Sequence, residues 1–413
     1  MIEAILERCA GLDVHQETIV VCFLSGPLTC TPCSELKTFG TTTDELLAMG
    51  HWLTDSGCTH IAMESTGVYW KPVWNILEAF DLDLTLANAH HVKNLPGRKT
   101  DMKDAQWIAK LLRCGLINKS FVPPTDIREL RDLTRYRKKI VEATTSEKNR
   151  IHKILQDANI KLTTHMSDVF CVSGRMLLQK IVNGEVITME FLQTHMLGSL
   201  RHKSPKLLQS LNGRLRKHHR DMLRFSWEHL LFLEQSISLI EMELRMRLNE
   251  KHNAIELLTS IPGVNEQAAT VILAEIGTDM TQFKNDSHLA AWAGVSPGIH
   301  ESAGKKKKSR ARSGNSILKS ILCECAWAAS VTRKTRLSAR YWSWVKRLGK
   351  KKALVALAHT LLRIIFHILL KKQSYLELGP DYLDKFNQER EEKRLKALIK
   401  ELEHKGYTVS SVA

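Results

Sequence analysis

Four carboxylates in the first quarter of the chain have the types and spacing of a phosphodiester-cleaving site. They are Asp13 in an apolar run, Glu64 at the end of HIAME, and the pair Asp101 and Asp104 in KTDMKDA. Carboxylates that lie together repel one another and raise each other's pKa unless divalent cations bind between them. Hard oxygen ligands of this kind favour Mg²⁺ or Mn²⁺. Two such metals stabilise the attacking and leaving oxygens of a phosphodiester, so the pattern predicts a two-metal site.

A second candidate group lies about two hundred residues further along the chain. Ser302 stands in GVSPGIHESAGKKKK, a basic segment flanked by glycines. A serine hydroxyl is a poor nucleophile at neutral pH unless something activates it. His300 is two residues away and is expected to be a neighbour rather than its base. The carboxylates and the serine together indicate two chemistries in one enzyme.

The elements that must position the carboxylates are predicted by residue patterns. β-Branched and aromatic residues bounded by turn-like residues indicate strands, and helical spacing indicates the helices between them. The expected strands are 9–24, 33–40, 59–64 and 82–87, and the expected helices are 43–55, 68–80 and about 100–114. Three strands followed by alternating helices and strands is the ribonuclease H arrangement.

In that arrangement the first and fourth strands lie side by side at the centre of the sheet, so Asp13 and Glu64 would meet. Asp101 and Asp104 are three residues apart on one helix face and can close the cluster from the side. Each carboxylate alone is more often a surface charge or a helix cap. Asp13, however, interrupts a hydrophobic strand, where burial of an unpaired charge is costly. The joint pattern therefore favours a site.

The rest of the chain is expected to be mainly helical. Helical spacing over 127–158 and again over 207–258 predicts paired helices or a coiled coil. Self-association and an intramolecular hairpin both satisfy this pattern. The predicted organisation is an α/β domain at 1–120, a helical coiled-coil region at 125–256 with a small helical insertion at about 160–206, a mainly helical domain at 257–375, and a charged C-terminal helix and tail at 376–413.

Positive charge is concentrated in one segment of the chain. The formal net charge is +16, and residues 303–352 alone hold sixteen Lys and Arg against one acid, a net charge of +15. Such clustering indicates a polyanionic partner, because each neutralised phosphate releases counterions. The aromatic residues Trp327, Tyr341, Trp342 and Trp344 fit either base stacking or the core. The candidate nucleic-acid contacts of this segment are Lys305, Lys306, Lys307, Lys308, Arg310 and Arg312.

A Pro-Gly turn precedes the serine segment and predicts a further contact with nucleic acid. IELLTSIPGVNEQAATVILAEIG is similar to a helix-hairpin-helix, in which the turn directs backbone N–H groups at a phosphate. The predicted binding residues are Pro262, Gly263 and Asn265. Asn265 stands where a second glycine is usual, and Asn tolerates a left-handed φ better than most residues. An ordinary packing corner between two helices is the alternative.

Cysteine usage and hydropathy bear on the compartment. The nine cysteines are odd in number and irregularly spaced, so they do not indicate a disulfide framework. The pairs that begin at Cys30 and Cys323 lack a second pair of ligands at the spacing of a zinc site. The apolar stretch ALVALAHTLLRIIFHILL has the length of a membrane span, yet His359, Arg363 and His367 recur along it at intervals of four residues. We expect an amphipathic core helix, no membrane, and a cytoplasmic protein.

Several of these motifs resemble those of one protein family. GLDVHQ, ESTGVYWKPV, KTDMKDA, IPGVNEQAATVILAEIG and LAAWAGVSPGIHESAGK are similar to the DEDD transposases of the IS110 insertion-sequence family. The long middle segment and the serine context HESAGK resemble its IS1111 branch more closely. The resemblance covers residues from about 9 to 120 and from 255 to 370.

The resemblance implies a fold, a reaction and partners. It implies a RuvC-like domain that carries Asp13, Glu64, Asp101 and Asp104 with Mg²⁺ or Mn²⁺, and a separate transposase domain in which Ser302 attacks DNA. The implied partners are donor-end and target DNA, a noncoding bridge RNA encoded by the element, and further copies of the chain in a dimer or tetramer with a composite site between protomers. The implied location is the bacterial cytoplasm, with action at the nucleoid. One residue departs from the pattern, because Ala303 separates the serine from its usual glycine.

Two other functions remain open on the residues. A hydrolytic endonuclease like a Holliday-junction resolvase would cut with water, and Ser302 would then be structural. A non-catalytic nucleic-acid-binding protein would need a degenerate acidic cluster, whereas all four carboxylates are present. We therefore predict a DNA transposase or recombinase that cleaves and exchanges strands through a covalent serine–DNA intermediate.

Overall fold

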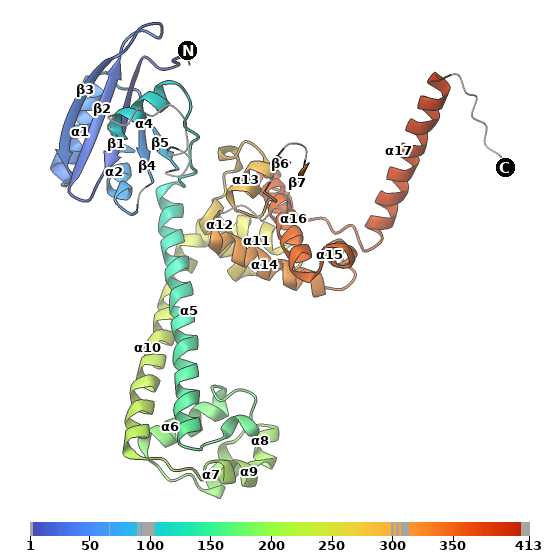
Figure 1. The fold of residues 1–413 in the computed structure, drawn as a ribbon. Helices are drawn as coiled ribbons and strands as arrows, with labels where there is room; N and C mark the ends of the chain where they lie inside the picture. The colour runs from blue at the N-terminus through green and yellow to red at the C-terminus, as the bar shows by residue number, and fades with distance from the viewer. Residues whose placement is uncertain are drawn as a thin grey trace. The chain divides into compact units, whose positions relative to one another are not determined.

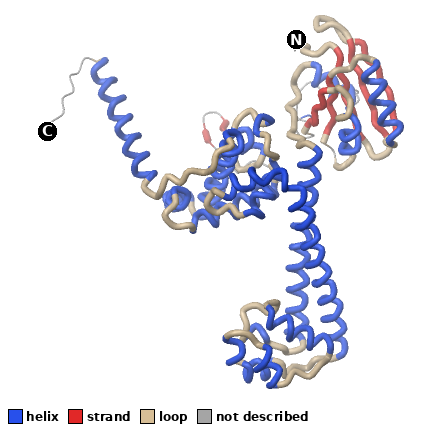
Figure 2. The backbone as a smooth tube through the Cα atoms, turned by 180° about the vertical axis from the view of Figure 1, so that it is seen from behind, coloured by secondary structure: helices blue, strands red, loops and turns tan. Residues whose placement is uncertain are grey.

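The chain folds into two compact units. The computed structural model describes residues 3–65, 67–88, 92, 104–298, 301–302, 305–306 and 314–405. Unit 1 comprises residues Met1–Val122 and unit 2 comprises Pro123–Ala413. Figure 1 and Figure 2 show an α/β fold in unit 1 and a mainly helical fold in unit 2. A mixed α/β N-terminal part followed by helices agrees with the predicted fold class.

Unit 1 is built on one five-stranded sheet. Its strands lie in the order β3-β2-β1-β4-β5, with β1 antiparallel to β2 and parallel to β4. The pairing of the first strand with the fourth, which the sequence predicted, is confirmed. The elements are β1 (Arg8–Val14), β2 (Thr18–Ser25), β3 (Cys33–Gly40), α1 (Thr43–Asp55), β4 (His60–Glu64), α2 (Trp70–Leu77), β5 (Asp83–Ala87) and α4 (Asp104–Arg113). A turn divides the predicted strand 9–24, where the N–H of His15 bonds the carbonyl of Thr18 at 3.0 Å.

Helices cover the two faces of this sheet. Alternate residues of β1, such as Leu12, pack in a core with Met49 of α1 and Leu77 of α2. The intervening residues, such as Cys9, pack in a second core with Ile108 of α4. The face of β1 that contains Cys9 also contains Gly11 and Asp13, because strand residues alternate between faces. The site therefore belongs to the α4 side of the sheet.

In unit 2, two long helices form an antiparallel stem. They are α5 (Thr125–Asp157) and α10 (Lys217–Leu248), which lie side by side in both views. Ion pairs cross between them, including Arg137 with Glu241. The two helices thus form a hairpin within one chain, and self-association stays a prediction.

The expectation of one continuous helical run over 207–258 is wrong. A loop at 211–216 precedes α10, and η2 (Asn249–Lys251) separates α10 from α11 (His252–Thr259). A Cβ atom at Gly213 would lie 2.3 Å from the carbonyl oxygen of Ala158, so the loop packs directly on the end of α5. This contact turns the chain back into α10, and helical periodicity alone does not reveal it.

A small helical head lies at the end of the stem, and we define it as residues 160–216 (Figure 1). It has a hydrophobic core of its own, in which Leu177, Leu192 and Leu207 are fully buried and pack with Trp227 of α10. Its elements are η1 (Leu162–Thr164), α6 (Val172–Asn183), α7 (Met189–His195), α8 (Ser199–His202) and α9 (Ser204–Ser210).

The other end of the stem carries a cluster of helices and a short hairpin. After α11 come α12 (Glu266–Ile276), η3 (Met280–Gln282), α13 (Asp286–Trp292), β6 (Glu301–Ser302), β7 (Lys305–Lys306), α14 (Ser316–Val331), α15 (Arg336–Leu348), α16 (Lys350–Lys371) and α17 (Tyr382–His404). The predicted domain boundaries within unit 2 stay a prediction.

The apolar helix α16 is a core helix of this cluster. By length and composition alone it is one helix that could cross a membrane, and half of its apolar window is buried. Its polar residues have partners within the fold, since Arg363 Nε lies 2.6 Å and His367 Nε2 lies 3.4 Å from Asp286 Oδ2. Burial of Asp286 would raise its pKa, but the hydrogen bond and charge of Arg363 outweigh burial and hold that pKa below its usual value. Packing within the fold thus accounts for the apolar face.

Candidate active site and nucleic-acid interface

Asp13 and Glu64 occupy neighbouring positions at the carboxyl ends of two parallel strands. The register pairs Leu12 with Met63, and the two carboxylates are the next residue on each strand. Ala62 packs in the core on the α4 side, so Glu64, two residues further, lies on that side too, as Asp13 does. The side chain of Asp13 is 23% exposed, and Glu64 Oε1 is buried. A rigid sheet thus places two carboxylates side by side.

Helix α4 approaches β1 unusually closely at Gly11. A Cβ atom there would lie 2.3 Å from the backbone nitrogen of Ala109 and 2.4 Å from the carbonyl oxygen of Ala105. Only glycine allows this contact. The helix begins at Asp104, immediately before Ala105, so the contact at Gly11 brings the start of α4 to the strand that carries Asp13.

The fourth predicted carboxylate, Asp101, lies outside the described residues. Within the part of the chain that the structure describes, no group of three or more Asp, Glu, His or Cys side chains is close enough to hold a metal ion. The free cysteines, Cys30 and Cys33 among them, belong to no such group there. The four-carboxylate site therefore remains a prediction, with Asp13 and Glu64 brought together and Asp104 at the first turn of the helix that packs on them.

His15 is a neighbour of the site that sequence reasoning missed. Its Nε2 lies 3.2 Å from Asp13 Oδ2, and its side chain is 61% exposed. The DVH spacing was a usable signal, because residues two apart at a strand end project to the same side. The imidazole is therefore a candidate to position the carboxylate of Asp13.

The serine segment is a loop whose two ends meet. The N–H of Asn315 bonds the carbonyl of Trp292 at 3.3 Å, and a Cβ atom at Gly314 would lie 2.4 Å from the nitrogen of Gly294. Between these ends, Ser302 of β6 pairs with Lys305 of β7 in a two-stranded hairpin. Other residues singled out in this segment lie outside the described residues: His300, Ala303, Gly304, Lys307, Lys308, Ser309, Arg310, Arg312 and Ser313.

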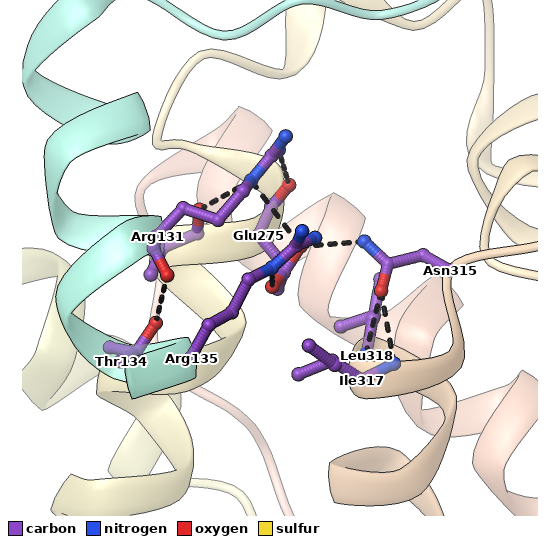
Figure 3. Close-up of polar contacts among 8 residues, drawn as sticks. Arg131, Thr134, Arg135, Glu275, Asn315, Ile317 and Leu318 are labelled. Carbon is purple, nitrogen blue, oxygen red and sulfur yellow. Dashed lines mark hydrogen bonds and ion pairs between the residues drawn. The ribbon is translucent and has the colours of Figure 1, made fainter. Parts of the chain in front are cut away.

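A buried glutamate supports the base of that loop (Figure 3). Glu275 of α12 is fully buried and accepts two hydrogen bonds of 2.9 Å from the guanidinium of Arg135 on α5. Arg131, one turn earlier on α5, donates to the Glu275 carbonyl at 2.6 Å, and its Nε lies 3.3 Å from Glu275 Oε2. Burial lowers the pKa of Arg131 to about 10, although Glu275 raises it.

Asn315 connects this network to the serine segment. Its Nδ2 donates to Glu275 Oε2 at 2.6 Å, while its Oδ1 accepts from the N–H groups of Ile317 and Leu318 and caps α14 (Figure 3). Glu275 therefore joins α5, α12 and the point where the serine loop becomes α14. Sequence reasoning did not find Glu275, since a single acid in an apolar helix gives no hint of partners on distant elements.

The Pro-Gly turn between α11 and α12 is packed on α14. Gly263 has a φ of 89°, and a Cβ atom there would lie 2.6 Å from the carbonyl oxygen of Cys325 and 2.5 Å from the nitrogen of Ala329. Asn265 has a φ of −95°, so its expected left-handed conformation is wrong. Its Oδ1 instead caps α12 by accepting from the N–H of Ala268 at 2.8 Å. Packing alone explains this glycine, and a role of the turn in DNA binding stays a prediction.

The aromatic residues of the basic segment divide into core and surface. Tyr341 is 1% exposed and belongs to the core, whereas Trp327 and Trp342 are 54% and 50% exposed. Trp342 Nε1 donates to the carbonyl of Ser330 at 3.2 Å, three residues along α14 from Trp327. Two indole rings thus stay accessible at the junction of α14 and α15, and exposed rings of this kind can stack on bases.

Comparison with known proteins agrees with this arrangement. Residues 10–160 match the family model of the IS110 DEDD transposases, described as a transposase. Residues 255–342 match the model described as the transposase IS116/IS110/IS902 family. An acidic α/β unit and a basic helical unit in one chain are thus those of a transposase.

Three relatives extend the comparison. The transposase for insertion sequence element IS1111A of Coxiella burnetii is 24% identical over 328 residues, 77% of this chain and 79% of that protein. The y4pF/y4sB protein of Sinorhizobium fredii is 31% identical over 135 residues, 32% of this chain and 35% of that protein. The insertion element IS110 43.6 kDa protein of Streptomyces coelicolor is 33% identical over 125 residues, 30% of each chain. The matched part of the chain therefore spans about a third of the length of the Sinorhizobium and Streptomyces proteins, and most of the length of the Coxiella transposase.

The chain belongs to the IS110 family of transposases.

Proposed function

We propose that this transposase cleaves and exchanges DNA strands through a covalent bond between Ser302 and DNA, with Asp13, Glu64, Asp101 and Asp104 as its acidic site. The observation that carries the proposal is the register of β1 and β4, which sets Asp13 beside Glu64 on the face that α4 covers. The domain assignment as RuvC-like rests on the same sheet order. The second family match, over residues 255–342, includes Ser302 and supports the proposed nucleophile.

The donor set of unit 1 fits a hard divalent cation. Asp13 and Glu64 offer carboxylate oxygens from adjacent strands, and Asp104 stands at the N-terminal turn of the helix packed on them. These residues, together with Asp101, would hold Mg²⁺ or Mn²⁺. When bound, the metals supply Lewis-acid stabilisation of the phosphodiester oxygens. The sheet contributes fixed positions for the ligands, and His15 Nε2 lies 3.2 Å from Asp13 Oδ2.

The serine step exchanges one phosphodiester bond for another. A bond forms between Ser302 Oγ and phosphorus, the bond from phosphorus to the leaving DNA oxygen breaks, and the serine proton ends on that oxygen. The phosphate ester that remains on the protein conserves the bond energy for rejoining to a second strand. The Glu275 network fixes the start of α14, and so the end of the loop that carries Ser302.

A covalent adduct distinguishes this mechanism from hydrolysis. The full-length protein is incubated with metal and a nicked suicide duplex, then denatured and resolved on a gel. We expect a denaturant-resistant protein–DNA species that is lost in Ser302→Ala. A matched panel of Ser296→Ala, Ser309→Ala and Ser313→Ala should retain it. Cutting without any covalent species in the wild type would overturn the proposal in favour of a resolvase-like hydrolase, and loss of the adduct in a panel variant would move the nucleophile.

The proposed partners are donor-end DNA, target DNA and an element-encoded bridge RNA. DNA follows from the transposase family, and the net charge of +15 in residues 303–352 suits either polymer. The long alignment with the IS1111A transposase supports the IS1111 branch. A structured noncoding segment beside the reading frame with short matches to both element junctions is the expected finding. Recombination in a reconstituted reaction without RNA would overturn the guided mechanism. We place the reaction in the bacterial cytoplasm.

An exposed stripe on α10 supports self-association of the chain. Phe225, Phe232, Leu239 and Met246 recur every seven residues, and each is more than half exposed. A seven-residue apolar repeat packs against another helix, and we propose that a second copy supplies it. Light scattering of Phe232→Lys should give a lower mass than the wild type, whereas Leu395→Lys on α17, also exposed, should not. A monomeric wild type at micromolar concentration would contradict this.

A further inference from the structure

The helical head carries an exposed basic face that neither family match includes. The two matched segments are 10–160 and 255–342, and the head lies between them. Residues 199–224 contain eight Lys and Arg and one acid, Asp221, a net charge of +7. All eight cationic residues are exposed. The basic face is defined as Arg201, Lys203, Lys206, Arg214, Arg216, Lys217, Arg220 and Arg224.

The charges of this face are exposed and have no carboxylate partner among the described residues. On the stem, Arg137 and Lys148 form ion pairs with carboxylates, whereas the exposed Lys139, Lys153 and Arg245 form none there. Among the residues that the structure describes, which include the whole head and stem, no carboxylate lies within ion-pair distance of the eight residues of the basic face. The nearby Asp157 instead bonds His219 Nε2 at 2.9 Å. The positive charge of the basic face is therefore not neutralised within the fold.

The residues of the basic face come from segments that adjoin one another, namely α8, α9, the loop at 211–216 and the first turns of α10. Lys217, Arg220 and Arg224 are spaced by three and four residues on α10 and hence project from one helix face. A groove of about 600 Å³ is lined jointly by Pro205 of α9, Leu215 of the loop and Arg220, so these segments border a common surface. The loop is held in place because the N–H of Arg214 bonds the carbonyl of Ala158 at 2.9 Å.

The stem separates this face from the Glu275 network, which holds the start of α14. The Glu275 network fixes α14, within the basic segment 303–352, to Arg135 of α5. The 22 residues from Arg135 to Asp157, at the head, span about 33 Å at 1.5 Å per residue. One turn of B-form DNA measures about 34 Å. The stretch of α5 between the Glu275 network and the head is therefore about as long as one turn of B-form DNA, and a support of this length suits a stiff duplex better than a flexible single strand.

We propose that the basic face of the head binds the phosphate backbone of duplex DNA, about one helical turn from the DNA held by the transposase segment. The choice of duplex DNA rests on the proposed function, whereas the position and charge of the face do not. Contacts of this kind fix the register of a protein on a duplex without reading its sequence. The head would then anchor the DNA that flanks the reacting phosphodiester.

The test compares two variants of equal charge in the full-length protein. Lys206→Ala, Arg214→Ala and Lys217→Ala are combined in a head variant, and Lys139→Ala, Lys153→Ala and Arg245→Ala in a stem control, whose three residues are also exposed. Affinity for a 30-base-pair duplex is measured against salt concentration. Each lost phosphate contact reduces the slope of log K against log salt by about 0.9, so the head variant should lose up to about 2.7. The stem control should keep the wild-type slope.

Further arms make the result decisive. Combined Lys206→Arg, Arg214→Lys and Lys217→Arg should retain the slope, and unchanged thermal unfolding of the head variant establishes that it folds. Equal slopes for the head variant and the stem control would overturn the inference. So would a loss of affinity for single-stranded RNA with duplex binding unchanged. Failure of the proposed function would have a different result. The wild-type protein would form no Ser302 adduct, while the head variant would still differ from the stem control in duplex binding.

Discussion

The two candidate groups of this enzyme are positioned by different physical means. In unit 1, Asp13 and Glu64 lie on adjacent strands, and backbone hydrogen bonds of the sheet determine their separation. In unit 2, Ser302 lies on a short hairpin in a loop, and side-chain contacts to the buried Glu275 secure the base of that loop. Neighbouring carboxylates repel one another, so a rigid sheet is needed to keep them together. The proposed nucleophile, in contrast, lies on a loop that is secured only at its base. We therefore expect substitutions of the carboxylates in unit 1 to reduce DNA cleavage, and substitutions in the Glu275 network of unit 2 to reduce the free energy of unfolding.

The largest effect is expected for the carboxylates of the sheet. Asp13→Asn or Glu64→Gln removes a charged metal ligand but leaves the strand pairing intact. If the metals contribute about 4 kcal/mol to the transition state, cleavage should fall by about a thousandfold. Gel-shift affinity for DNA should change little. Asp55→Asn, at an exposed position in α1, is the control and should cut normally. Wild-type cleavage by Asp13→Asn and Glu64→Gln would remove these residues from the site.

The next effect is expected at Glu275, where the consequence is mainly structural. Glu275→Gln leaves two guanidinium groups without their buried counter-charge, and loss of one partner of a buried pair costs about 3–5 kcal/mol. Denaturant unfolding measures this cost. Glu129→Gln removes the partner of Arg247 from an exposed pair, which contributes about 0–1 kcal/mol. Equal losses in the two variants would mean that the buried network does not stabilise the fold.

The two regions also differ in how much of their structure could be predicted from the sequence. Helix 43–55 was predicted correctly because its residue pattern is local. The pairing of the first and fourth strands was predicted correctly because the order of elements matches the ribonuclease H arrangement. The break at 211–216 was missed, since Gly213 packs against Ala158, which is remote in sequence. Glu275 was missed for the same reason, since Arg131, Arg135 and Asn315 lie on distant elements, whereas the local DVH spacing of His15 could have been used. Candidate residues on a regular strand are thus predictable, and the contacts that support a loop are not.

A smaller effect is expected where unit 1 depends on a single backbone contact. Gly11→Ala places a methyl group 2.3 Å from the backbone of α4, which cannot yield as a flexible side chain can. Overpacking of this kind costs about 1–3 kcal/mol and should shift the start of α4 away from Asp13, so cleavage should fall as well as stability. Gly40→Ala is the control, because its methyl group meets only the flexible end of Glu45. Normal cleavage by Gly11→Ala would mean that the site does not depend on this contact.

The smallest effect concerns the pH dependence of unit 2. Burial lowers the pKa of His359 on α16, and the charges of Arg363 and Arg340 lower it further, while Asp286 raises it. The folded state therefore disfavours the protonated imidazole, whereas the unfolded chain takes up a proton near pH 6.5. Stability from this group is present above about pH 6.5 and is lost as the pH falls through the folded pKa. In denaturant unfolding at pH 7.5 and 5.5, wild type should lose more stability on acidification than His359→Gln, whereas His404→Gln, at an exposed position on α17, should behave like wild type. An identical pH response of wild type and His359→Gln would show that His359 titrates alike in the folded and unfolded chains, and would contradict the lowered pKa of this partly buried side chain.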